Sequence, residues 1–102
     1  MAVVQIFKAL GDPVRLEIVK RLSDGTAYTI GSLSQDLGVT RQGARKQIEV
    51  LVSANVVRLK PVGRETQVTL DTASLEQARA FIAALESQWD QRLLALKKFT
   101  EE

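Results

Sequence analysis

The chain has 102 residues, 45% of them hydrophobic, and 14 Lys and Arg against 12 Asp and Glu give a formal net charge of +2. This length and balance indicate one globular domain over residues 1–102. The sequence contains no Cys and no His. Disulfides, thiolate or histidine metal sites, and catalytic centres that need a Cys nucleophile or a His base are therefore excluded.

The apolar stretch near the start of the sequence does not predict a membrane segment. It runs from Val3 to Leu10, is interrupted by Gln5 and Lys8, and ends at Gly11. It is too short for a signal-peptide core with its cleavage site and far below the roughly 18–20 apolar residues of a membrane span. We therefore expect a cytoplasmic protein with no membrane partner.

Two short helices are predicted before residue 25. Gly11 closes the first, Asp12 caps the second, and Pro13 occupies its first position. Apolar residues recur at helical spacing until Asp24 and Gly25 break the pattern. These residues are Val14, Ile18, Val19 and Leu22.

Residues 29–54 have the spacing of a helix-turn-helix. Thr29 caps the first helix, which we expect to end at Gly38, and Thr40 caps the second, which reaches about Ala54. Gly38 also permits the left-handed turn between them. The inward-facing residues are Ile30, Leu33 and Leu37 in the first helix and Ala44, Ile48 and Leu51 in the second.

After Asn55 the apolar period changes from helical to two, which predicts a β-hairpin over residues 56–70. Val57 and Leu59 mark its first strand, and Val68 and Leu70 its second. Between them, Pro61-Val62-Gly63-Arg64 supplies turn residues.

From residue 73 to residue 99 the chain lacks Gly and Pro, which predicts one amphipathic helix of roughly 40 Å. A domain this small cannot cover it end to end, so we expect part of its apolar stripe to meet a second copy in a two-fold dimer. The alternative is a helix folded wholly over its own domain. The candidate interface residues, for dimer or intramolecular packing, are Phe7, Leu10, Ile82, Leu85, Trp89, Leu93 and Leu96.

The positive charge is concentrated between residues 40 and 64. That segment holds six basic side chains and one acid, Glu49, a net charge of +5, whereas the remaining eight basic and eleven acidic residues sum to −3. The charge thus follows the second helix of the motif and the hairpin, the two elements that a winged helix places on DNA. An ordinary solvated face is the alternative explanation of the charge alone.

The order helix, helix, helix-turn-helix, hairpin and long helix predicts a mainly α fold with a small β-hairpin, a winged helix-turn-helix that dimerises through its terminal helices. The stretches "FKALGDPVRLEIVKRLSDG", "TIGSLSQDLGVTRQGARKQIEVLVSANVV" and "GRETQVTL" resemble the ArsR/SmtB-type transcription repressors. The ending "ALESQWDQRLLALKKF" is similar to the metal-independent branch of that family. The resemblance implies a dimeric DNA-binding protein that occludes a promoter, often its own.

Several positions depart from the family. Relatives that sense metals use Cys pairs in the first motif helix or Asp, His and Glu sets on the last helix, so the absence of Cys and His argues against either metal site. Gly43 lies inside the recognition helix, Gln47 stands where relatives often carry His, and Asn55 replaces the usual Gly. Asn tolerates the same left-handed backbone conformation as Gly.

We assign DNA-binding roles to eight residues: Thr40, Arg41, Gln42, Arg45, Lys46, Arg58, Lys60 and Arg64. Gln42 is suited to an adenine edge and Arg45 to a guanine edge in the major groove, and Lys46 to a phosphate. Arg64 at the hairpin tip is a candidate for the minor groove or the backbone, with Arg58 and Lys60 behind it. Thr40 primarily caps its helix. For the residues of the helix, the alternative is phosphate contact or simple solvation. For the basic residues of the hairpin, it is a charged edge that discourages strand pairing.

The resulting hypothesis is a cytoplasmic repressor that binds a two-fold related operator in double-stranded DNA as a homodimer, with no cofactor. A second hypothesis is a protein–protein adaptor that uses the long helix on a winged-helix scaffold. An enzyme is a distant third, because Cys and His are missing and a chain of this size leaves little room for a large pocket. The carboxylate pair on the last helix, Glu86 and Asp90, indicates a solvated helix face rather than acid–base chemistry. The operator, the regulated genes and any effector stay open.

Overall fold

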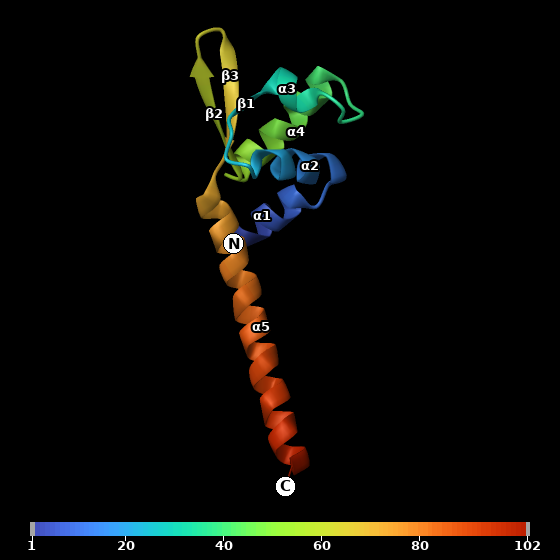
Figure 1. Cartoon of the computed structure of the whole chain (residues 1–102), viewed down its shortest axis with the longest axis vertical. Helices are drawn as coiled ribbons and strands as arrows, with labels where there is room; N and C mark the ends of the chain where they lie inside the picture. The colour runs from blue at the N-terminus through green and yellow to red at the C-terminus, as the bar shows by residue number, and fades with distance from the viewer. Residues whose placement is uncertain (1, 102) are drawn as a thin grey trace.

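The computed structural model describes residues 2–101 as a helical body with a small antiparallel sheet and one long helix that leaves it (Figure 1). The chain follows the predicted order of helices and hairpin, with one additional short strand. The elements are α1 (Ala2–Leu10), α2 (Pro13–Leu22), β1 (Tyr28–Thr29), α3 (Ile30–Ser34), α4 (Arg41–Ser53), β2 (Val57–Val62), β3 (Glu65–Leu70) and α5 (Thr72–Glu101). Across the described residues, every helix is too short or too polar to span a lipid bilayer.

The start of α2 follows the predicted cap. The carboxylate of Asp12 accepts hydrogen bonds from the backbone N–H groups of Val14 and Arg15, at 2.9 and 3.1 Å. Pro13 occupies the first turn, where its missing N–H leaves no intrahelical bond unmade. Ile18 and Leu22 then bury the inner face of the helix, as their spacing predicts.

The first helix of the motif is shorter than expected. α3 ends at Ser34 rather than at Gly38, because Asp36 already has a left-handed backbone with φ 61°. Gly38 follows with φ 74°, and two left-handed residues this close cannot continue an α-helix. Leu37 therefore lies in the turn, where it packs against the core instead of extending the helix.

Arg21 of α2 explains why the chain leaves the helix there. Its guanidinium donates to the carbonyl oxygens of Leu33, Gln35 and Asp36, at 3.1, 2.5 and 3.3 Å. Carbonyls at the end of a helix lack intrahelical donors, and this side chain supplies them from another element. The sequence carries no local signal for a contact of this kind.

The sheet contains a third strand that was not predicted from the sequence. β1 pairs with β3 through Tyr28↔Val68 and Thr29↔Gln67, and the strand order is β1-β3-β2. A strand of two residues shows no period, so only its partner reveals it. β2 lies at the sheet edge, which is where a strand tolerates Pro61, and Gly63 opens the tight turn to β3 with φ 62°.

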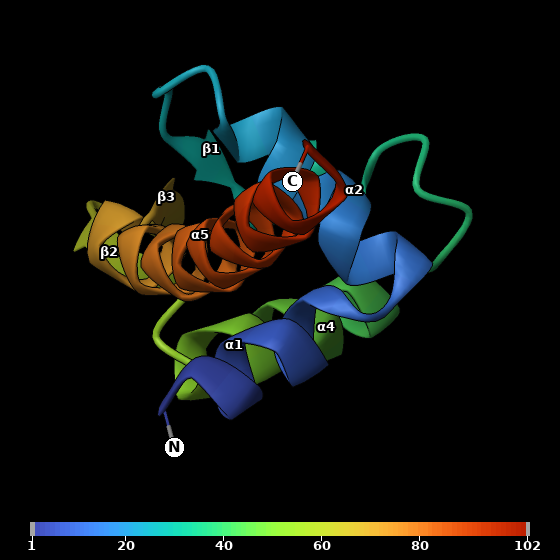
Figure 2. The ribbon, with the colours of Figure 1, turned by 90° about the horizontal axis from the view of Figure 1, so that it is seen from below.

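One apolar core joins the helices to the sheet. Its buried members include Ile6 of α1, Ile18 of α2, Leu33 of α3, Ile48 of α4 and Val68 of β3. Figure 2 shows α1 beside α4, and α1 also contacts α5. The rings of Phe7 in α1 and Phe81 in α5 meet edge to face, with centroids 5.8 Å apart.

Only the first turns of α5 belong to this core. Ser74 and Ala78 are buried, and the hydroxyl of Ser74 donates to the carbonyl of Asn55. Every residue from Arg79 to Thr100 is exposed. The chain consequently measures 69 × 25 × 25 Å, with a radius of gyration of 18.3 Å against about 13 Å for a compact domain of this length. The alternative of a helix folded wholly over its own domain is wrong.

Candidate nucleic-acid interface

A cleft of about 580 Å³ separates the start of α4 from the tip of the hairpin. Its walls bring together two segments of the basic region that are about twenty residues apart in sequence. The lining residues are Thr29, Ile30, Arg41, Gln42, Arg45, Arg64, Glu65 and Thr66. Figure 1 shows the hairpin turn and α3 at one end of the molecule, opposite the C-terminal end of α5.

The capping geometry of α4 sets the first wall of this cleft. The side chain of Thr40 accepts a hydrogen bond from the backbone N–H of Gly43 at 2.9 Å, as expected for an N-cap. A Cβ on Gly43 would lie 3.2 Å from that same hydroxyl oxygen, which is tighter than an ordinary contact. Gly43, an unusual residue inside a helix, therefore leaves room for the cap.

Arg41 and Gln42 follow the cap, and both are exposed at the cleft. The guanidinium of Arg41 lies against the backbone of α3, since a Cβ added to Gly31 would be 3.4 Å from its central carbon. Gly31 thus provides the space in which Arg41 rests. The side chain of Gln42 keeps both its donor and its acceptor available to a partner.

Arg45 lies one turn further along α4 and also lines the cleft. Its Nε is 3.7 Å from a carboxylate oxygen of Glu49, and the two side chains are 66% and 63% exposed. An exposed ion pair within one helix contributes little, so Arg45 remains free to exchange this partner for another acceptor.

Four of the predicted DNA-binding residues are not among those that line the cleft: the cap residue Thr40, and Lys46, Arg58 and Lys60. Lys46 is exposed on α4, and Lys60 is exposed on the edge strand β2. Nε of Arg58 donates to Oδ2 of Asp71 at 3.0 Å, at the base of the hairpin. That hydrogen bond, followed by one from the backbone N–H of Ala73, holds the pKa of Asp71 below its ordinary value of 3.8.

Sequence reasoning missed the acidic residue of the cleft and the side chain that anchors α4. Glu65 lines the cleft directly after Arg64, and the turn spacing alone does not show which way it faces. Arg15 of α2 donates to Oε1 of Gln47 at 2.7 Å, across 32 positions of sequence. Gln47, where relatives often carry His, is therefore half-buried in a contact within the chain.

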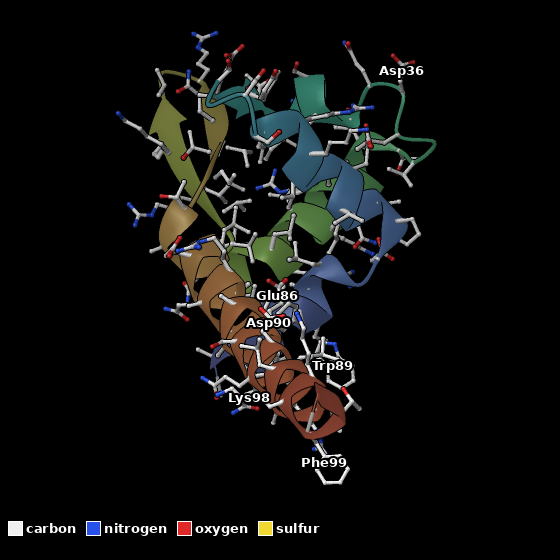
Figure 3. All side chains as sticks on the ribbon, turned by 60° about the horizontal axis from the view of Figure 1, so that its bottom comes forward. Asp36, Glu86, Trp89, Asp90, Lys98 and Phe99 are labelled. Atoms are coloured by element: carbon white, nitrogen blue, oxygen red, sulfur yellow. The ribbon has the colours of Figure 1, made fainter. Side chains whose placement is uncertain are left out.

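The candidate interface residues divide into two groups. Phe7 and Leu10 are half-buried and pack against the chain's own core. The other five are 45–60% exposed along α5: Ile82, Leu85, Trp89, Leu93 and Leu96. Figure 3 shows Trp89 and Phe99 projecting from this helix, with Glu86 and Asp90 also on it. Among residues 2–101, no three carboxylates gather into a group that could hold a metal ion.

The sequence and the fold of this chain are both similar to those of known proteins. A model described as a helix-turn-helix domain matches residues 10–60. The HTH-type transcriptional regulator Rv2034 of Mycobacterium tuberculosis is 34% identical over 73 residues, which cover 72% of this chain and 67% of that protein.

Two solved structures share the fold. An ArsR-like transcriptional regulator from Rhodococcus sp. RHA1 matches with a TM-score of 0.81 and 30% identity, over 96% of this chain and 92% of that chain. A homodimeric winged helix-turn-helix DNA-binding domain from Mycobacterium bovis, a possible ArsR-family regulator, matches with a TM-score of 0.65 and 20% identity, over 90% and 82% of the two chains.

These neighbours confirm the winged helix-turn-helix expected from the order of elements. The relatives are transcriptional regulators, a non-enzymatic DNA-binding class, and they do not favour the adaptor hypothesis. The chain belongs to the ArsR family of winged helix-turn-helix transcriptional regulators.

Proposed function

We propose that this regulator is a cytoplasmic repressor that binds a two-fold related operator as a homodimer and occludes the promoter. The observation that carries the proposal is the cleft, where Arg41, Arg45 and Arg64 face one space from two different elements. The recognition helix, α4, and the wing, which is the hairpin of β2 and β3, converge on one basic cleft. This arrangement suits a duplex, because each element can enter a neighbouring groove or follow the backbone between the grooves.

In this proposal the start of α4 enters the major groove. Gln42 and Arg45 read base edges, as amide–adenine and guanidinium–guanine pairs allow. Arg41 and Arg64 contact the backbone or the minor groove from the two sides of the cleft. Thr40 remains the helix cap. Lys46, Arg58 and Lys60 bind phosphates beyond the edges of the cleft, since most protein–DNA hydrogen bonds go to phosphate and sugar.

The exposed apolar stripe of α5 supports the homodimer. Five large side chains, from Ile82 to Leu96, are about half exposed in the isolated chain. Exposed apolar patches of this kind mark interaction surfaces, and a second copy covers them by pairing α5 with α5 around a two-fold axis. The Mycobacterium bovis domain of the same fold is itself homodimeric. The two recognition helices then reach half-sites about one DNA turn, ~34 Å, apart.

One experiment tests the class of partner and the assembly together. Duplexes bound by the protein are selected from a random DNA pool, and light scattering on the same sample counts the subunits. We expect an enriched palindrome, with half-site centres about 10–10.5 base pairs apart or a multiple of this, and the mass of two chains. Failure to enrich any sequence contradicts the proposal, and so does a monomer on the selected duplex.

The salt dependence of binding tests the electrostatic part of the proposal. With roughly 6–10 phosphate contacts per dimer, the affinity for the selected duplex should fall by about 10³–10⁵ between 50 and 200 mM salt. Fluorescence anisotropy across that range measures the slope. An affinity that hardly changes would show that the basic cleft does not meet the phosphate backbone.

A further inference from the structure

We propose that Glu65 is a specificity-determining residue of the cleft. Its carboxylate accepts a hydrogen bond from the exocyclic amine of one operator base, and it rejects base pairs that offer only acceptors at that position. This inference rests on the proposed DNA-binding function and assigns the reading of one base pair to the wing rather than to α4.

The position of Glu65 is the first observation. It is the acidic member of a cleft wall that also carries Arg41, Arg45 and Arg64. The side chain is exposed, and no ion pair within residues 2–101 involves it, although three guanidinium groups line the same cleft. Glu65 is therefore not present to neutralise an arginine, and its oxygens remain available to a partner.

The negative charge of Glu65 in this cleft opposes binding to DNA in general. A carboxylate that faces a polyanion is repelled by every duplex, whatever its sequence. Such a charge in a DNA-facing cleft weakens non-specific binding, and it contributes to function only where it finds a hydrogen-bond donor. Because an ionised carboxylate only accepts hydrogen bonds, it distinguishes donors from acceptors more sharply than an amide or a hydroxyl does.

The edges of the base pairs offer few such donors. In the major groove they are the N4 amine of cytosine and the N6 amine of adenine, and in the minor groove the N2 amine of guanine. A carboxylate in the minor groove therefore favours G·C over A·T, whose edge there carries acceptors alone. In either groove, Glu65 distinguishes the base pairs at one position by whether a base amine lies within reach of its carboxylate.

Strand pairing holds the backbone at Glu65. Glu65 begins β3, the central strand of the sheet, and pairs with Val62 in the last rung before the turn. The Gly63-Arg64 turn thus places Arg64 and Glu65 next to each other at the cleft. Arg64 offers a cation to the DNA backbone, and Glu65 offers a hydrogen-bond acceptor to a base. Sites held on strands are positioned more accurately than sites on free loops.

The test compares selection from a random duplex pool for the wild type, Glu65→Gln and the control Asp90→Asn. Both variants remove one negative charge from an exposed side chain, but Asp90 lies on α5, away from the cleft. We expect Glu65→Gln to lose about tenfold of the preference at one base-pair position of each half-site, because Gln both donates and accepts. Its affinity for random DNA should rise a few-fold, whereas Asp90→Asn should select the wild-type sequence.

The possible results separate this inference from the function on which it rests. An unchanged selection profile in Glu65→Gln overturns the inference. A uniform rise in affinity for all sequences also overturns it, because Glu65 then only adjusts the charge of the cleft. If the wild type itself enriches no sequence, the proposed function fails and the role of Glu65 fails with it.

Discussion

The guanidinium of Arg15 joins three helices. From α2 it donates through Nε to the carbonyl of Ala9 at 2.6 Å and through Nη1 to Gln47 of α4 at 2.7 Å. Ala9 lies in the last turn of α1, where a carbonyl has no partner within its own helix. One side chain therefore closes α1 and fixes the recognition helix against the body.

We expect Arg15→Ala to lower the free energy of unfolding by about 2–3 kcal/mol, since hydrogen bonds from a charged group contribute about 1.5–3 kcal/mol. Urea denaturation followed by circular dichroism measures the loss. Lys20→Ala, at an exposed position of the same helix, is the control and should change stability by less than about 0.5 kcal/mol. Similar losses in the two variants would show that Arg15 is only a surface cation.

Thr40 provides a second prediction because its hydroxyl satisfies the backbone N–H of Gly43. Thr40→Ala removes this cap and should cost about 1 kcal/mol of stability, whereas Thr40→Ser retains the hydroxyl and most of the stability. Thermal unfolding of the two variants compares them directly. Equal destabilisation by Ala and Ser would mean that the methyl group of Thr40, not its hydroxyl, is what α4 needs.

The hairpin and α5 meet at Asp71. One oxygen of its carboxylate accepts from Arg58 of β2, and the other accepts from the backbone N–H of Ala73 in the first turn of α5, both at 3.0 Å. The same carboxylate therefore fixes the base of the wing and caps the helix that leaves the body. Close to it, the bond from Ser74 to the carbonyl of Asn55 ties α5 to the end of α4.

The lowered pKa of Asp71 makes this junction sensitive to pH. A carboxyl whose folded pKa lies below its unfolded value stabilises the protein above the unfolded pKa, and the contribution is lost as the pH falls through the folded pKa. Asp71→Asn should retain the cap and lose the ion pair. Its melting temperature should therefore lie below that of the wild type at pH 7, and the difference should shrink below about pH 4. A difference that persists in acid would contradict an ionic origin.

The elongated shape supports the proposal that α5 is the assembly surface. Beyond the contact of Phe81 with Phe7, the apolar side chains of α5 from Ile82 onward are largely exposed to solvent in a single chain. Burying each large apolar side chain contributes about 1.5–3 kcal/mol, so covering this stripe favours association with a second copy. The hairpin turn and α3, which contribute residues to the cleft, lie at the opposite end of the molecule from the C-terminal end of α5 (Figure 1), so the proposed pairing of α5 with α5 does not require the cleft to be covered.

We expect Leu85→Glu to convert the dimer to a monomer and to weaken binding to a two-half-site duplex by at least tenfold, because one subunit then binds alone. Sedimentation velocity measures the assembly, and anisotropy measures the binding. Ser87→Glu adds the same charge two residues away, about 200° around the helix, and should leave the dimer intact. If both variants dissociate the dimer, the effect of the added charge is general. If neither variant dissociates it, the dimer is built on another surface.

Much of the fold was predictable because its signals are local. Asp12-Pro13 marks the start of α2, the change to a period of two marks the hairpin, and Asn55 adopts the left-handed backbone, φ 60°, that its substitution for Gly predicts. The end of α3 was not predictable, since Arg21 reaches its carbonyls from another helix. β1 was missed because two residues carry no pattern.

The residues of the candidate interface were also predictable where the signal is local and unpredictable where it depends on contacts between elements. Spacing and charge alone identified Thr40, Gln42, Arg45 and Arg64 as candidates, because α4 and the hairpin are each recognisable within a few residues. Only the tertiary structure decided that Arg58 is paired with Asp71, and that Glu65 lines the same cleft as the arginines. Periodicity reports which face of an element is apolar, but contacts between elements depend on how the packed core orients them.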